Sequence, residues 1–146
     1  MQVTHSAFTD AQQTNESTRS AKVYSDLDLF FTKKDTKDVN ILKDILAVKR
    51  SVRNLVLLNH YEKPFHPEIG SGIREMLFEN ISPIVSQILV KKVGEILANY
   101  EPRALVEEIN AIPNLDGNSY KLSIQFRIIN IPTDLQEVEV FLERLR

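Results

Sequence analysis

The chain of 146 residues contains no cysteine. It therefore has no disulfide framework, no thiol nucleophile and no cysteine-based zinc site, as expected of a protein that works in a reducing cytoplasm or in a particle assembled there. No apolar run approaches the roughly 18 residues of a membrane-spanning helix. The N-terminus also lacks the basic start and apolar stretch of a secretory signal. We therefore expect no membrane partner.

An excess of positive charge is also missing, since 18 Lys and Arg residues stand against 20 Asp and Glu residues. Domains that bind nucleic acids usually carry a strong basic excess, so we expect no nucleic-acid partner. The chain has four glycines, Gly70, Gly72, Gly94 and Gly117. They form neither a phosphate-binding loop nor a Gly-x-Ser-x-Gly elbow for a nucleophile, and we expect no small-molecule substrate.

The three histidines, His5, His60 and His66, match no known spacing of metal ligands. His60 and His66 stand close together with Glu62 and Glu68 nearby, but no two histidines are spaced to share one face of a helix. We therefore expect no metal and no other cofactor.

Apolar residues make up 42% of the chain, which is enough for the hydrophobic core of one domain. Residues 1–21 are rich in Gln, Thr, Ser and Asn and have few large apolar groups. Such a segment cannot bury enough surface to offset the loss of chain entropy on ordering. We predict a flexible N-terminal arm over residues 1–21 and a single domain over residues 22–146.

Apolar residues at helical spacing predict a long helix over Asp38–Asn59, with Asp38 as its N-cap. Its apolar stripe consists of Ile41, Ile45, Val48, Val52 and Leu55, widened by Leu42, Leu46 and Val56. A second long helix is predicted to begin at Ser82-Pro83, because Ser caps helices well and Pro is tolerated in the first turn. The inward stripe of this second helix consists of Val85, Leu89, Val93, Ile96 and Tyr100.

Between these helices, two prolines and two glycines predict a structured loop over His60–Gly72. Ser71 is the expected cap of a short helix over Ile73–Asn80. The inward residues of this short helix would be Ile73, Met76 and Leu77. We expect Phe78 to pack in the core as well, although it falls outside that stripe.

After Arg103 the period of the apolar residues changes to two, which predicts β-strands. The three strands contain Leu105, Ile109 and Ile112, then Tyr120, Leu122, Ile124, Phe126 and Ile128, and finally Val138, Val140 and Leu142. Asp116-Gly117 indicates a hairpin between the first two. A short strand with Leu27, Leu29 and Phe31 is predicted near the N-terminus. We predict an α+β fold, with two main helices and a short one packed on a small antiparallel sheet.

The segment Glu101-Pro102-Arg103 ends the second long helix, because Pro102 has no N–H to donate and its ring disfavours helical geometry at Glu101. The chain must turn there, and it presents an acid and a base side by side. This pair is either a solvated helix end or a place where a partner binds. We expect the turn to be exposed, so that Arg103→Glu leaves the isolated protein folded.

Three further motifs accompany Glu101-Pro102-Arg103. They are Tyr24-Ser25-Asp26-Leu27-Asp28, then Lys63-Pro64-Phe65-His66-Pro67-Glu68-Ile69-Gly70, and then Leu77-Phe78-Glu79-Asn80. In this order and spacing, the motifs resemble the small baseplate-wedge, or sheath-initiator, proteins of contractile phage tails. Relatives of these proteins occur in type VI secretion baseplates. The likeness runs from about Val23 to the C-terminus.

The resemblance implies a structural protein of the virion, located in the tail baseplate and assembled in the host cytoplasm. It also implies that Glu101, Pro102 and Arg103 dock on a helical core bundle made by other baseplate wedge proteins. The two charged side chains would make charge-assisted hydrogen bonds, for which the planar fork of an arginine is well suited.

The tail sheath subunit is the second partner that the resemblance implies. Its strands would pair with an edge of this sheet, and that edge would set the register of the first sheath ring. The expected edge is the strand with Val138, Val140 and Leu142. Acidic residues alternate with these three, as is common in edges that avoid uncontrolled pairing.

Two alternatives stay open, a peptidoglycan-cleaving enzyme and a subunit of a type VI secretion baseplate. Members of the resembled family have sometimes carried a lysozyme label, and glycoside hydrolysis needs two carboxylates across a cleft, one with a raised pKa. The acids of this chain include Glu68, Glu75, Glu79 and Glu101, but none lies in a pattern resembling phage lysozymes. The basic segment Lys33–Arg53 and the acidic C-terminal part are either solvated faces or complementary to neighbours in an assembly.

Overall fold

The computed structural model describes residues 24–30, 38–132 and 134–143. The chain divides into two compact units, residues 1–44 and residues 45–146. The arm predicted over residues 1–21 lies outside the described residues, as does Phe31 of the predicted N-terminal strand.

The first unit contains two short strands, β1 (Ser25–Leu27) and β2 (Ile41–Lys43), which pair antiparallel. The helix predicted to start after Asp38 therefore starts later, at Asp44. The prediction was wrong because pairing with β1 holds residues 41–43 in extended conformation, and helical spacing of apolar residues cannot reveal such non-local pairing. Instead of capping a helix, the Asp38 carboxylate accepts a hydrogen bond from the adjacent Val39 N–H at 2.8 Å.

Helix α2 (Asp44–Leu57) buries one face of its surface, as an amphipathic helix should. The buried side chains on that face are Ala47, Val48, Val52 and Val56. The predicted stripe is thus confirmed at Val48, Val52 and Val56. It is wrong at Leu46, which is 63% exposed, because the buried face is narrower than the predicted one.

The predicted loop over residues 60–72 is confirmed, and it leads into the short helix α3 (Ile73–Met76). Ile73, Met76 and Leu77 are buried as predicted. The N-cap is Gly72 in left-handed conformation, φ 59°, and not Ser71. The Ser71 hydroxyl nevertheless accepts a hydrogen bond from the Ile73 N–H and donates one to the Val56 carbonyl oxygen, so it ties α3 to α2.

Phe78 is exposed, and its predicted place in the core was wrong. Helix α3 ends at Met76, so Phe78 lies in the following turn and not on the buried face of a longer helix.

Helix α4 (Pro83–Tyr100) begins as predicted, with the Ser82 hydroxyl accepting from the Val85 N–H at 3.3 Å. The Ser82 N–H in turn donates to the buried hydroxyl of Tyr120 at 3.2 Å. The hydrophobic side chains that this helix buries are Val85, Leu89, Val93 and Leu97. Tyr100, predicted on the inward stripe, is 38% exposed, because the buried face continues through Leu97.

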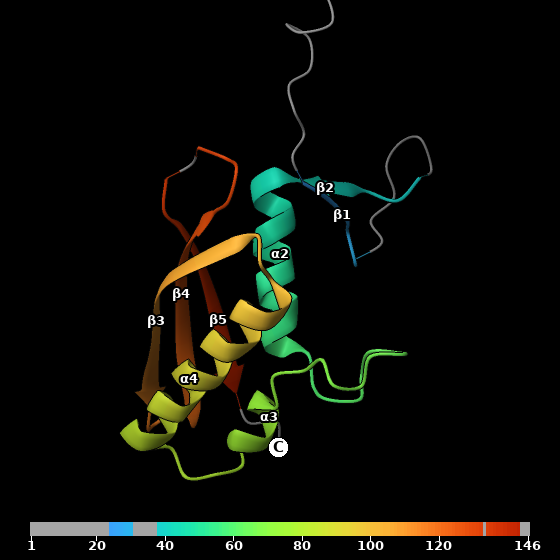
Figure 1. Cartoon of the computed structure of the whole chain (residues 1–146). Coiled ribbons are helices and arrows are strands. Elements are labelled where there is room, and N and C mark those ends of the chain that lie inside the picture. Colours follow the sequence, from blue (N-terminus) through green and yellow to red (C-terminus); the bar gives the residue numbers. More distant parts are fainter. Residues whose placement is uncertain (1–23, 31–37, 133, 144–146) are drawn as a thin grey trace, which may run out of the picture. The chain divides into compact units, whose positions relative to one another are not determined.

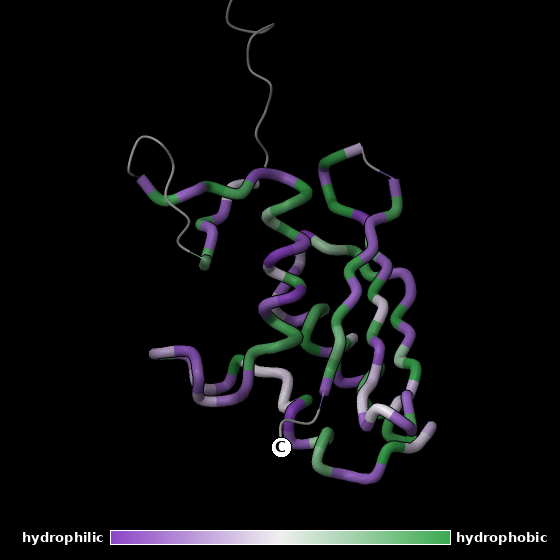
Figure 2. Tube along the Cα trace, turned by 180° about the vertical axis from the view of Figure 1, so that it is seen from behind, coloured by the Kyte–Doolittle hydropathy of each residue, from purple (hydrophilic) through white to green (hydrophobic). Residues whose placement is uncertain are grey.

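The second unit also contains a three-stranded antiparallel sheet in the order β3–β4–β5, with β3 at Ala104–Asn114, β4 at Ser119–Ile128 and β5 at Gln136–Glu143. Helix α4 lies across one face of this sheet (Figure 1). Hydrophobic and hydrophilic residues alternate along the strands (Figure 2). The fold is therefore α+β, as predicted.

The central strand β4 supplies the largest share of the core from the sheet. Its buried side chains are Tyr120, Leu122, Ile124, Phe126 and Ile128, all of them predicted. The prediction was less accurate for β3, where Leu105 and Ile112 are exposed. Leu105 lies between Ala104 and Val106, which face inward, so it faces outward. The register shift between Val106 and Glu108 moves Ile112, which would otherwise continue that inward row, to the outer face.

None of the helices in the described part of the chain combines the length and the hydropathy that a bilayer crossing requires.

Leu89→Ala should lower the free energy of unfolding by about 2–5 kcal/mol, because it leaves a cavity at a fully buried position between α4 and the sheet. The matched control is Ile88→Ala on the same helix. Ile88 is 42% exposed, so its loss should cost less than about 1 kcal/mol. Urea denaturation measures both, and equal losses would contradict the placement of the core.

Candidate functional site

The turn between α4 and β3 is held by three backbone hydrogen bonds. The Glu101 N–H donates to the Leu97 carbonyl at 3.0 Å and closes the helix. The Ala104 N–H donates to the Glu101 carbonyl at 3.1 Å, and the Ile129 N–H donates to the Arg103 carbonyl at 2.9 Å. The backbone of the turn is thus fixed both to the end of α4 and to the residue that follows β4.

The side chains of Glu101 and Arg103 form a bidentate ion pair. Arg103 Nε donates to Glu101 Oε1 at 2.6 Å, and Arg103 Nη2 donates to Glu101 Oε2 at 2.8 Å. Glu101 is only 2% exposed and the Arg103 side chain 24% exposed. A buried carboxylate is costly unless it is paired and hydrogen-bonded, so Arg103 makes the burial of Glu101 possible.

The expectation of an exposed turn is therefore wrong for Glu101 and correct for Pro102, which is exposed. Arg103→Glu would place a second carboxylate beside the buried one, so it should destabilise the protein and not leave it unaffected. The sequence brings an acid and a base together at this turn, but spacing alone cannot tell whether they face solvent or one another. In the structure the acid points inward and binds the base. A partner at this turn would reach Pro102 and the exposed part of Arg103 first.

The predicted edge strand, β5, has a single neighbour among the described strands, β4. It pairs with β4 from Gln136 to Glu143 without a register shift. Its inward side chains, Val138, Val140 and Leu142, are all buried. These three side chains therefore hold β5 against the core. Another strand could pair only with the backbone N–H and C=O groups on the edge of β5 that faces away from β4.

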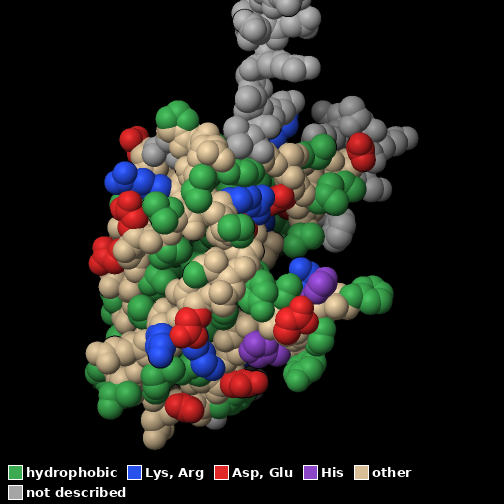
Figure 3. All heavy atoms as spheres, in the orientation of Figure 1, with side chains coloured by type: hydrophobic (Ala, Val, Ile, Leu, Met, Phe, Trp, Pro, Cys, Tyr) green, Lys and Arg blue, Asp and Glu red, His purple; other side chains and the backbone are tan. Residues whose placement is uncertain are grey.

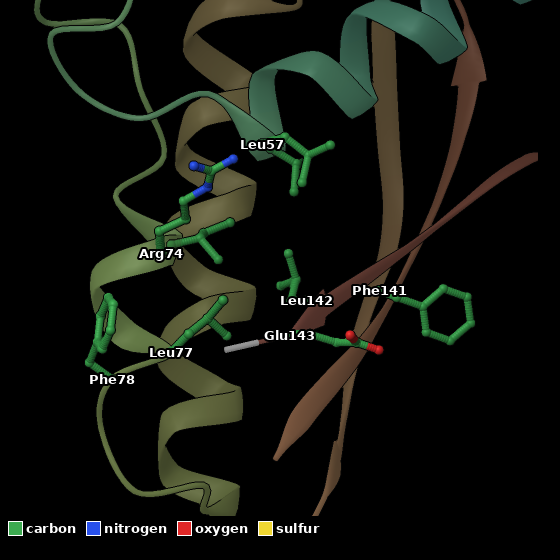
Figure 4. Close-up of a pocket in the computed structure, with 9 residues that line it drawn as sticks. Leu57, Arg74, Leu77, Phe78, Phe141, Leu142 and Glu143 are labelled. Atoms are coloured by element: carbon green, nitrogen blue, oxygen red, sulfur yellow. The ribbon is translucent and has the colours of Figure 1, made fainter. Parts of the chain in front are cut away.

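A mostly apolar hollow of about 180 Å³ lies where α2, α3 and the end of β5 meet. Leu57, Leu77 and Leu142 surround it, and the ring of Phe141 points away from it (Figure 4). Among the described residues that line it, Glu143 is the only carboxylate. The hollow therefore lacks the second carboxylate that glycoside hydrolysis requires.

A second, more polar hollow of about 260 Å³ lies between the loop after α2 and helix α4. Two carboxylates, Glu68 and Glu95, line it. The pKa of Glu68 is lowered, first by a backbone hydrogen bond at Glu68 itself and then by the His66 side chain at 3.0 Å. A glycosidase acid needs a raised pKa, so Glu68 is shifted in the wrong direction for that role.

Within the described ranges, no three His, Asp or Glu side chains are grouped so that they could hold a metal ion.

No protein-family model matches the chain, but comparison with known proteins finds a relative in sequence. The baseplate wedge protein gp25 of Enterobacteria phage T4 is 29% identical over 119 residues, which cover 82% of this chain and 90% of that protein. The chain resembles the baseplate wedge proteins, as its motifs predicted.

Solved structures share the fold. A putative tail lysozyme from Geobacter sulfurreducens has a TM-score of 0.60 at 21% identity, covering 68% of this chain and 89% of that one. A chain of the anti-feeding prophage baseplate has a TM-score of 0.58 at 17% identity, covering 84% and 87%. A chain of the postcontracted pyocin R2 baseplate has a TM-score of 0.54 at 20% identity, covering 81% and 98%.

Arg103→Ala should lower the free energy of unfolding by about 3–5 kcal/mol, because it leaves the buried Glu101 carboxylate without its bidentate partner. The matched control is Arg127→Ala. Arg127 pairs with Glu107 at 2.7 Å, but both side chains are well exposed, so the loss should stay below about 1 kcal/mol. Urea denaturation compares the two variants. A small loss for Arg103→Ala would show that the pair adds little to stability.

Proposed function

We propose that this chain is a structural component of a contractile-tail baseplate wedge, and that it docks on a helical bundle of other wedge proteins and templates the first ring of the tail sheath. The observation that carries the proposal is the 29% identity to a baseplate wedge protein over 82% of the chain. Two of the solved structures with the same fold are chains of baseplates. Its place would be the tail baseplate of a virion, assembled in the host cytoplasm.

The turn Glu101-Pro102-Arg103 is the proposed docking surface for the wedge bundle. Its three residues have different roles in this proposal. Pro102 is exposed and contacts the bundle directly, and Arg103 contacts it with the exposed part of its side chain. Glu101 is buried and holds the Arg103 fork in a fixed orientation. A preorganised arginine loses less side-chain entropy when it binds, which favours docking.

The outer edge of β5 is the proposed pairing surface for the sheath subunit. The sheet has two edges, and β3 is the less suitable one. Strand β3 contains a bulge between Val106 and Glu108 and a proline at position 113, both of which obstruct the addition of a further strand. Strand β5 has neither and stays in regular register with β4 throughout. A regular edge can transmit its register to an added strand.

A lytic enzyme is the weaker alternative. One solved structure with this fold is described as a putative tail lysozyme, but at 21% identity the likeness concerns the fold alone. One hollow has a single carboxylate among its described lining residues, and in the other the pKa of Glu68 is lowered, the opposite of what a glycosidase acid needs. A type VI secretion baseplate subunit would use the same surfaces, and neighbouring genes for tail or secretion proteins distinguish the two.

Proline substitution on β5 tests the proposed templating. Along an edge strand, successive backbone N–H groups point alternately toward the neighbouring strand and away from the sheet. Proline has no N–H, so either Glu139→Pro or Val140→Pro removes an N–H that an added sheath strand could bind. The variant that keeps the bonds to β4 should stay folded, and if it is Val140→Pro its melting temperature should also fall, because that substitution removes a buried side chain. Particles assembled with that folded variant should carry few or no sheathed tails in negative-stain micrographs.

The matched control places proline at successive positions of the other edge, Asn110→Pro and Ala111→Pro in β3. The folded variant of this second pair should give normal sheathed tails. Normal sheath with the folded β5 variant would instead exclude pairing through β5.

Arg103→Lys tests the docking surface without removing the positive charge. Lysine lacks the planar fork and cannot bind both Glu101 oxygens in the same geometry. We expect the amount of this chain in purified particles to fall about tenfold, as when a buried arginine anchor of an interface is lost. Quantitative immunoblotting measures it, with Arg127→Lys as the control. Unchanged incorporation would remove Arg103 from the docking surface.

A further inference from the structure

The loop between α2 and α3 is held by several hydrogen bonds between its own backbone groups. The Tyr61 N–H donates to the Pro67 carbonyl at 3.0 Å and the Ser71 N–H donates to the Leu58 carbonyl at 2.8 Å, which closes the base of the loop. The His66 N–H also donates to the Lys63 carbonyl at 3.3 Å near the tip. These bonds fix the path of the loop as it extends from the end of α2 (Figure 1).

A side-chain clamp adds to this order. The Glu62 carboxylate accepts from the Asn59 backbone N–H at 2.8 Å and from the Asn59 side-chain amide at 2.7 Å. These two hydrogen bonds, that from the backbone first, lower the pKa of Glu62. A carboxyl with a lowered pKa is ionised at neutral pH, so the Glu62 carboxylate can accept both hydrogen bonds there.

Two aromatic side chains project from this ordered loop. Tyr61 is 86% exposed and Phe65 is 98% exposed. Both adopt left-handed backbone conformation, with φ of 67°, which is a genuine outlier for a bulky side chain. Hydrophobic side chains are visible at the end of the loop, clear of the rest of the molecule (Figure 3). Neither core packing nor backbone preference explains aromatic residues at these positions, and strain of this kind is typical of functional sites.

We propose that Tyr61 and Phe65 are a preorganised aromatic anchor that inserts into an apolar pocket of a neighbouring protein in the assembly. This inference rests on the proposed function. Aromatic side chains are typical anchors of protein interfaces, because they bury a large area on binding. The hydrogen bonds of the loop fix the backbone before binding, so that cost is reduced further.

The charges near the anchor favour a protein partner with an acidic rim. Lys63 lies between the two aromatic residues in the sequence and is exposed. The carboxylates of Glu62 and Glu68 bind within the loop, to Asn59 and His66 respectively. A membrane surface is a poor fit, because anionic lipids attract clusters of four to eight basic residues and this loop has a single lysine.

The size of the anchor indicates that it works as part of a larger interface. Two aromatic side chains bury about 150–250 Å² each, whereas a stable interface buries about 800 Å² on each partner. The anchor therefore adds to contacts made elsewhere on the chain, such as those proposed for the turn at Pro102 and for the edge of β5.

The test compares the incorporation of variants into purified tail particles. Tyr61→Ala combined with Phe65→Ala should reduce the amount of this chain per particle by about tenfold, as for a lost hot spot. The melting temperature of the isolated variant should change by less than about 2 °C, because both side chains are exposed. Leu115→Ala removes another hydrophobic side chain, 69% exposed, from a different loop and should leave incorporation unchanged.

Two further variants distinguish the effect of the Phe65 ring from that of the backbone conformation at this position. Phe65→Gly suits the left-handed conformation and removes only the ring, so it should reduce incorporation while the protein stays folded. Phe65→Trp keeps an aromatic anchor and should restore incorporation. Full incorporation of the double alanine variant would overturn the proposal while leaving the proposed function intact. If the protein without any substitution were absent from the purified particles, the proposed function itself would be contradicted.

Site-specific cross-linking identifies what the anchor contacts. A benzophenone side chain in place of Phe65, irradiated in assembled particles, should give a product with a different tail protein. A product with a second copy of this chain, or no protein product, would overturn the proposed partner.

Discussion

The bidentate bond between Arg103 and the buried Glu101 carboxylate is the interaction on which the arrangement of α4 and the sheet depends. Pro102 ends the helix, but ending a helix does not decide where the chain goes next. The ion pair and the hydrogen bond from the Ile129 N–H to the Arg103 carbonyl fix the direction in which β3 leaves the turn. That direction lays the apolar face of α4 on the sheet.

Three surfaces on the second unit are the proposed contacts with other proteins. The turn offers a rigid corner with Pro102 and part of Arg103, the sheet offers the regular edge of β5, and the loop after α2 offers Tyr61 and Phe65. All three are held by hydrogen bonds within the chain. Preorganised surfaces of this kind suit a protein that binds several neighbours at once, because little conformational entropy is lost at each contact.

Local patterns in the sequence predict some of these elements well and others badly. Ser82-Pro83 and the alternation along β4 are strong local signals, and both predictions are confirmed. The strand β2 was predicted as helix because its extended state depends on pairing with the distant β1. The burial of Glu101 and the exposure of Phe78 depend on tertiary packing, and no local spacing of residues carries that information. Motif resemblance located the baseplate relatives, but it could not assign separate roles to Glu101 and Arg103.

Negative-stain microscopy of particles assembled without this protein tests the central claim most directly. The claim is that the chain seeds the sheath as a structural part of the baseplate. The account predicts tubes or baseplates that lack sheath. Complete, normally sheathed tails that penetrate the host wall poorly would contradict it and would favour a lytic role.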